Sequence, residues 1–83
     1  MLKIGDEVSW RHGWGSGPLR SAVVTSIDVT DYPREKYGDS REQAGWDLVK
    51  ENRVVVSLDT GNWAYGSQIS PLGTDPNKWH QEY

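Results

Sequence analysis

The chain has 83 residues, a formal net charge of −3 and no cysteine. This length predicts a single domain with a thin core, and the lack of cysteine excludes disulfides, thiolate chemistry and cysteine-ligated metals. Nine basic residues are interspersed among twelve acidic ones, which weakens the general attraction to phosphate on which most nucleic-acid binders depend.

Nothing in the sequence suggests a membrane segment. No stretch approaches the about 18 apolar residues that a spanning helix requires. The first residues, MLKIGDEVSW, lack the apolar region of a secretory signal. We therefore expect a cytoplasmic protein that does not associate with membranes.

The aromatic residues are five tryptophans and four tyrosines, with no phenylalanine. Tryptophan and tyrosine combine an apolar body with a polar tip, which suits them to interfaces. In a thin core they also bury the most area per residue. We therefore expect most of them in the core and a few at a contact surface.

The first strand signals lie in the N-terminal third. Residues 7–12 alternate apolar and polar side chains, which is typical of a half-buried strand, and the preceding Gly5-Asp6 pair predicts a turn. Residues 21–29, SAVVTSIDV, are rich in β-branched residues but do not keep a strict period of two. We expect a strand with a bulge or strong bend near Thr25-Ser26.

A second pair of strands is predicted near the C-terminus. Residues 53–59 alternate, and the turn at residues 59–61 includes a glycine that can adopt a positive φ. Residues 62–70 form the returning strand, which Gly66 interrupts and Pro71 ends. The apolar positions of these strands give the predicted core: Val8, Trp10, Ala22, Val24, Ile27, Val54, Val56, Leu58, Ile69 and Leu72.

The segment between these pairs, residues 28–52, is too long for a structureless loop in a compact domain. Its first part, residues 31–39, is charged and carries a proline and a glycine, so we expect an exposed loop. Ser40 and Gln43 fit a helical capping box, yet Gly45 allows only about one turn. We favour a hairpin instead, in which WDLV pairs with VVVSL through a turn at Glu51-Asn52.

Two segments are expected to be loosely held. Residues 30–45 combine many charges with few apolar anchors, so we predict that they are the most mobile internal part of the chain. The tail, residues 73–83, is polar and is expected to be loose unless Trp79 docks it.

The order of these parts resembles the small SH3-like barrels of the KOW and Tudor type. IGDEVSW looks like their first strand, AVVTSI like the bent second strand, and VVVSLDTGNWAYGSQISPL like the third and fourth strands with the closing turn. The resemblance implies an all-β fold, a small SH3-like barrel of about five short antiparallel strands over residues 1–72. Residues 28–52 depart from the pattern as a long charged insertion between the second and third main strands.

No arrangement of residues predicts catalysis. His12 and His80 are the only histidines and have no second ligand nearby in the sequence, so we predict neither a metal site nor a cofactor. The GWGSG stretch lacks the Lys-Ser/Thr and the helix of a phosphate-binding loop. The chain is therefore expected not to be an enzyme.

The resemblance to Tudor-type barrels implies a ligand site at one end of the barrel, built from aromatic residues of the first loop and of the last strands. An aromatic cage surrounds a cation with π faces, and a carboxylate such as Asp59 would help. In the alternative interpretation, Trp63 and Tyr65 point into the core. The predicted partner-binding residues are Trp14, His12, Tyr32, Tyr37, Trp63 and Tyr65.

Three classes of function stay open. The first and favoured one is a module that binds a protein or peptide. The second is an RNA or DNA contact module of KOW type, and the third is a structural subunit whose aromatic residues form an oligomer interface. The negative net charge favours the first and third classes. The basic face of the second would comprise Arg11, Arg20, Arg34, Lys36 and Arg41.

Overall fold

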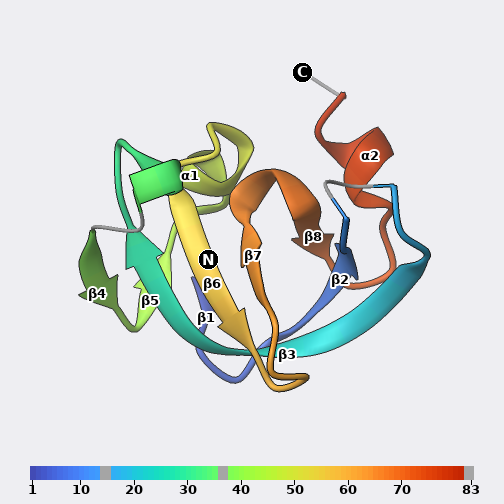
Figure 1. Ribbon diagram of the computed structural model, residues 1–83, viewed down its shortest axis with the longest axis horizontal. Helices are drawn as coiled ribbons and strands as arrows, with labels where there is room; N and C mark the ends of the chain where they lie inside the picture. The colour runs from blue at the N-terminus through green and yellow to red at the C-terminus, as the bar shows by residue number, and fades with distance from the viewer. Residues whose placement is uncertain (14–15, 36–37, 82–83) are drawn as a thin grey trace.

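The computed structural model describes residues 1–13, 16–35 and 38–81 (Figure 1). Strands are the main secondary structure, with 45% of the residues against 18% in four short helical segments, which confirms the predicted all-β class. In chain order the elements are β1 (Leu2–Lys3), β2 (Glu7–Arg11), β3 (Leu19–Val29), the 3₁₀ turn η1 (Pro33–Glu35), β4 (Asp39–Arg41), β5 (Gln43–Ala44), α1 (Trp46–Lys50), β6 (Val54–Leu58), β7 (Trp63–Tyr65), the 3₁₀ turn η2 (Gly66–Gln68), β8 (Ile69–Pro71) and α2 (Pro76–Trp79).

The main sheet is antiparallel, with the strand order β7-β6-β3-β2-β8 and with β4 added to β3. Strands β1 and β5 form a separate two-stranded sheet. Strands β7 and β8 end the order, so the sheet of the described residues curls without closing into a barrel. The helical segments α1, η2 and α2 lie along the upper edge of Figure 1, where both helices contact η2.

Strand β3 organises this sheet because it is long and bent. Its first half pairs with β2, and its second half lies between β4 and β6. The pairing with β6 shifts register between Val24 and Ser26, which confirms the predicted bulge. Figure 1 shows β3 curving across the whole width of the molecule. One strand therefore contributes to both halves of the sheet.

The predicted turns are also present. Gly5 has φ +95° and its N–H donates to the Val24 carbonyl at 2.8 Å, so this turn is fixed against the bulge of β3. Gly61 has φ +86° between β6 and β7, where a side chain would strain the backbone. Pro71 is the last residue of β8, as expected for a residue that cannot donate to a ladder.

All of the predicted core residues are buried except Leu72, which is 54% exposed. The prediction for Leu72 is wrong because the residue follows Pro71, after the pairing of β8 with β2 has ended, and so nothing turns its side chain inward. Four further residues, which the alternation did not identify, complete the core: Leu2, Ala44, Val49 and Ala64.

The predicted hairpin of residues 46–49 with residues 54–58 is wrong, because WDLV lies in helix α1. The helix buries Val49 fully and packs Trp46 and Leu48 partly against the core, so its apolar residues follow helical rather than strand spacing. Asn52, with φ +55°, reverses the chain after the helix, and the Arg53 N–H donates to the Leu48 carbonyl at 2.9 Å.

The proposed capping box at Ser40 is also not formed. Ser40 lies in β4, opposite Asp28, and its hydroxyl donates to the Asp28 carboxylate at 3.2 Å. The helix begins later, with Gly45 at its N-cap. The segment 28–52 thus contains the end of β3, the strands β4 and β5 and the helix α1.

Trp79 packs the tail against the rest of the chain, so the tail is not loose as it would be without this contact. Asp75 caps α2 by accepting from the Asn77 N–H at 3.0 Å, and Pro76 occupies the first helical position. The Trp79 ring meets the Trp46 ring edge-on at 5.5 Å, and the Lys50 ammonium lies 4.6 Å from its centroid. We call Trp46, Lys50, Trp79 and His80 the C-terminal cluster.

Candidate functional site

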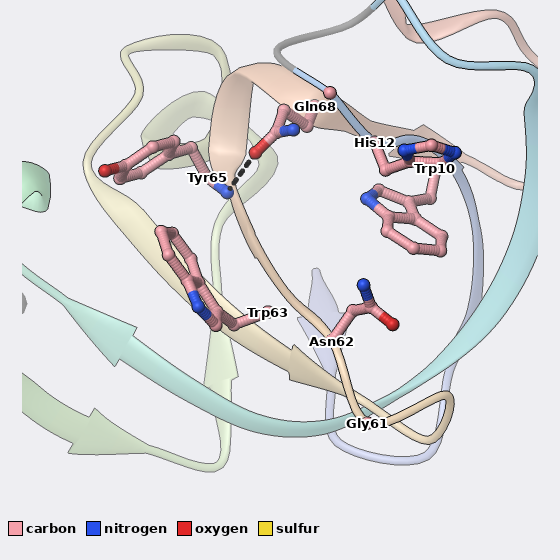
Figure 2. A pocket seen from close by; sticks show the side chains of 8 residues that line it. Trp10, His12, Gly61, Asn62, Trp63, Tyr65 and Gln68 are labelled. Carbon is pink, nitrogen blue, oxygen red and sulfur yellow. Dashed lines mark hydrogen bonds between the residues drawn. The ribbon is translucent and has the colours of Figure 1, made fainter.

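A cavity of about 390 Å³ opens between β2 on one side and the β6–β7 turn, β7 and η2 on the other. Figure 2 shows Trp10 and His12 on one side of β7, and the rings of Trp63 and Tyr65 on the other side of the same strand. We call this space the aromatic cavity. Its lining residues are Trp10, His12, Gly13, Gly61, Asn62, Trp63, Tyr65 and Gln68.

Strand β7 supplies one wall through two residues on the same face, Trp63 and Tyr65 (Figure 2). Their rings meet edge-on, with centroids 5.1 Å apart and planes at 86°. Tyr65 is only 8% exposed, whereas Trp63 is 43% exposed. Of the two arrangements that the sequence allowed, burial applies to Tyr65 and exposure to Trp63. Tyr65 therefore belongs to the buried wall and Trp63 to the open mouth.

Hydrogen bonds hold that wall in place. The Tyr65 N–H donates to the Gln68 side-chain carbonyl at 3.0 Å, drawn as the dashed line in Figure 2. The other end of the same carboxamide donates to the Arg11 carbonyl at 3.3 Å. Gln68 is itself buried. One side chain thus links β7 to β2 and sets the width of the aromatic cavity.

Trp10 forms the opposite wall. It was predicted as a core residue, and it is 4% exposed, yet it also lines the cavity. Its indole Nε1 is buried and, within the described residues, has no hydrogen-bond partner. The sequence signal for Trp10 was its strand alternation, which indicates burial but says nothing about a cavity beside the ring.

The glycine-rich stretch after β2 positions His12 at the mouth. Gly13 has φ +64°, a conformation that glycine adopts at low cost. The Gly17 N–H donates to the His12 carbonyl at 2.9 Å, and a Cβ on Gly17 would come within 2.8 Å of that oxygen. The Arg11 guanidinium also donates to the Gly17 carbonyl at 2.9 Å. The exposed His12 ring lies 5.7 Å from the Trp10 ring.

The carboxylate suggested for a cation cage lies elsewhere. Asp59 accepts from the Val23 N–H at 3.0 Å and so is directed at the backbone of β3. The described residues around the aromatic cavity include no aspartate or glutamate. They present aromatic faces, two carboxamides and one imidazole, a set suited to non-covalent contacts.

A second cavity, of about 520 Å³, contains the predicted residue Tyr32, which is 67% exposed. Tyr65 lines both cavities, so it separates them. The structure therefore brings together His12, Trp63 and Tyr65 at one cavity and Tyr32 at the neighbouring one. Trp14 and Tyr37, the other two predicted site residues, lie outside the described residues.

Ion pairs occupy Arg11 and Arg41, two of the residues predicted for a basic face, and also Arg53, which was not among them. Arg11 makes two hydrogen bonds to the Asp75 carboxylate, at 2.9 and 3.0 Å. The hydrogen bond from Arg11 lowers the pKa of Asp75, and the same bond raises the pKa of Arg11. Arg41 lies 3.5 Å from Asp39. Arg53 bonds to Asp31, which raises the pKa of Arg53.

Within the described ranges, no three histidine, aspartate or glutamate side chains gather closely enough to hold a metal ion. No helix in the described part of the chain is both long enough and apolar enough to cross a membrane.

Comparisons with known proteins identify no relative of this chain. No protein-family model matches the chain. No curated protein and no solved structure matches it either.

Proposed function

We propose that this chain is a non-catalytic binding module of SH3-like type that takes a segment of a protein or peptide into the aromatic cavity. The observation that carries the proposal is Trp63, a tryptophan 43% exposed at the mouth of a cavity whose other walls are aromatic. Tryptophan is among the residues that most often dominate binding energy at protein interfaces.

The strand arrangement supports the SH3-like part of the proposal. Five antiparallel strands follow the order β7-β6-β3-β2-β8, one long bent strand serves both halves, and the 3₁₀ turn η2 joins the two end strands. The three stretches that resemble KOW and Tudor barrels correspond to β2, to the bulged part of β3, and to β6 through β8.

The walls of the cavity support binding because little needs to be ordered when a ligand enters. Gln68 fixes Tyr65 relative to β2, and the buried Trp10 is fixed by the core. Preorganised walls reduce the entropy cost of association. Only the mouth, at Trp63, His12 and Asn62, carries exposed side chains.

Nucleic acid is the less favoured ligand. Arg11 and Arg41 lie against aspartates, so part of the candidate basic face is neutralised locally. Phosphate contacts would also have to overcome the net charge of −3.

The proposal is tested by selecting peptides from a displayed random library and measuring their affinity by calorimetry. Trp63→Ala should weaken the selected peptides by at least about 2 kcal/mol, the range of an interface hot spot. Leu72→Ala, which removes an even more exposed apolar side chain that lines neither cavity, should leave the affinity unchanged.

Three results would contradict the proposal. Equal affinity of the wild type and Trp63→Ala for every selected peptide would exclude the aromatic cavity. A nucleic acid that binds more tightly than any peptide, with an affinity that falls steeply with salt, would favour the KOW-type alternative. Self-association that Trp63→Ala abolishes, seen by sedimentation, would favour the oligomer interface.

A further inference from the structure

The Trp10 indole is an unusual group in the wall of the aromatic cavity. Trp10 is 4% exposed, and within the described residues its Nε1 is the one buried side-chain nitrogen or oxygen without a hydrogen-bond partner. A buried indole N–H normally finds an acceptor, because leaving it unpaired costs free energy. In Figure 2 this nitrogen lies on the edge of the ring that is turned toward β7, the strand that carries Trp63 and Tyr65.

The neighbouring polar groups do not supply that acceptor. The Gln68 carbonyl accepts from the Tyr65 N–H, and the Gln68 amide donates to the Arg11 carbonyl. The Asn62 side-chain carbonyl accepts from the Thr60 hydroxyl at 3.3 Å. Neither carboxamide accepts from Trp10 in this structure, so a ligand can supply the acceptor.

The electrostatics of the cavity argue against a cationic ligand. An N–H directed into the cavity presents the positive end of its dipole, and the described lining residues provide no carboxylate to offset a cation. Aromatic faces alone attract an ammonium group, but this cavity also contains a hydrogen-bond donor.

We infer that the aromatic cavity is specific for a neutral amide carbonyl, which enters at the mouth beside His12 and Asn62 and accepts the Trp10 Nε1–H. This inference rests on the proposed function and names the ligand chemistry for it. Because Nε1 is closed to solvent in the unliganded structure, entry of the carbonyl displaces a side chain at the mouth. His12 and Asn62 are both exposed and line the cavity beside Trp10.

The amide can come from a side chain or from the peptide main chain, and three small probes separate these sources from a cation. N-butylacetamide represents a side-chain amide, N-acetylpyrrolidine a main-chain amide before proline, and butyltrimethylammonium a cation of similar size. Each is titrated into the ¹⁵N-labelled chain while the indole N–H resonances are followed. The Trp10→Phe variant identifies the Trp10 resonance by its loss.

At least one amide should bind about tenfold more tightly than the ammonium probe, the ratio expected when one buried donor is satisfied in one complex and not in the other. That amide should move the Trp10 resonance downfield. If only one amide does so, it identifies the source. Trp10→Phe should remove the preference. If that variant does not fold, substitution of the other four tryptophans assigns the Trp10 resonance by elimination, and its shift in the wild type decides the question.

The inference is overturned if the ammonium probe binds as tightly as both amides, if no probe binds, or if an amide binds without moving the Trp10 resonance. None of these results decides the proposed function, which is tested separately by the loss of peptide affinity in Trp63→Ala. A peptide ligand that depends on Trp63 while Trp10 stays unaffected would retain the binding module and reject the amide specificity.

Discussion

Two aromatic regions of this molecule use the same residue type in opposite ways. In the C-terminal cluster, the Trp79 ring is contacted by Trp46 and by the Lys50 ammonium, and the Trp79 carbonyl accepts from Lys50 at 3.2 Å. In the aromatic cavity, Trp63 is 43% exposed and Trp10 keeps a buried N–H without a partner.

The difference teaches how a small domain divides its aromatic residues between stability and binding. Two polar side chains of the C-terminal cluster are hydrogen-bonded, since Lys50 donates to the Trp79 carbonyl and the His80 ring bonds to the Ile69 carbonyl at 2.9 Å. It connects α2 to the rest of a thin core. In the aromatic cavity, part of the Trp63 surface is exposed and the Trp10 N–H has no hydrogen-bond partner, so a ligand can contact both.

The largest expected effect on stability comes from Trp79→Ala. The substitution removes the ring that packs α2 against Trp46 and the core. We expect a loss of about 2–3 kcal/mol in the free energy of unfolding, below the about 3–5 kcal/mol of a fully buried tryptophan because Trp79 is only partly buried. Chemical denaturation measures this loss. A change under about 0.5 kcal/mol, typical of an exposed site, would show that the cluster does not stabilise the fold.

The matching substitution in the cavity, Trp63→Ala, should cost less than about 1 kcal/mol of stability, because much of the Trp63 ring already meets solvent. The same denaturation series measures it. A loss equal to that of Trp79→Ala would mean that Trp63 serves packing, and the contrast between the two regions would disappear.

The ion pair between Arg11 and Asp75 predicts a dependence of stability on pH. Hydrogen bonding from Arg11 lowers the pKa of Asp75 in the folded chain. The ionised carboxylate therefore stabilises the fold above the unfolded-state pKa of about 3.9. This contribution is lost as the pH falls through the lower folded-state value.

Asp75→Asn isolates the charge, because asparagine can still cap α2. When the pH is lowered from neutral to below the folded-state pKa of Asp75, the melting temperature of the wild type should fall further than that of Asp75→Asn. Asp39→Asn is the control, since its exposed pair with Arg41 should add little at any pH. Parallel melting curves for the wild type and Asp75→Asn at every pH would contradict the linkage.

The smallest effect concerns local opening in residues 30–45. The strands β4 and β5 in this segment are short, and every residue of β4 is exposed. We expect faster amide hydrogen exchange in β4 than in β6, although both pair with the second half of β3. Equal protection of the two strands would show that this segment opens only with the whole domain.

Strands with local signals could be predicted from the sequence, and elements that depend on distant contacts could not. The alternation in residues 7–12 and 53–59, the turn glycines and the bulge of β3 all have causes within a few residues. Helix α1 has five residues, too few to be stable alone, and forms because Val49 packs into the core.

The candidate site shows the same limit. The alternation in β7 puts Trp63 and Tyr65 on one face but does not say which of them the neighbouring strands cover. For Trp10 the strand pattern predicted burial correctly, and only the packed structure shows the cavity beside its ring. The role expected for Asp59 failed because its carboxylate accepts from the backbone of β3, a contact between distant residues.

The most direct test of the account compares the indole N–H resonances of the two regions in one titration. A selected peptide is added to the ¹⁵N-labelled chain, and the resonances of Trp10, Trp63, Trp46 and Trp79 are followed after assignment by single substitution. Binding in the aromatic cavity predicts that Trp10 and Trp63 shift while Trp46 and Trp79 stay in place. Larger shifts at Trp46 and Trp79 than at Trp10 and Trp63 would contradict it.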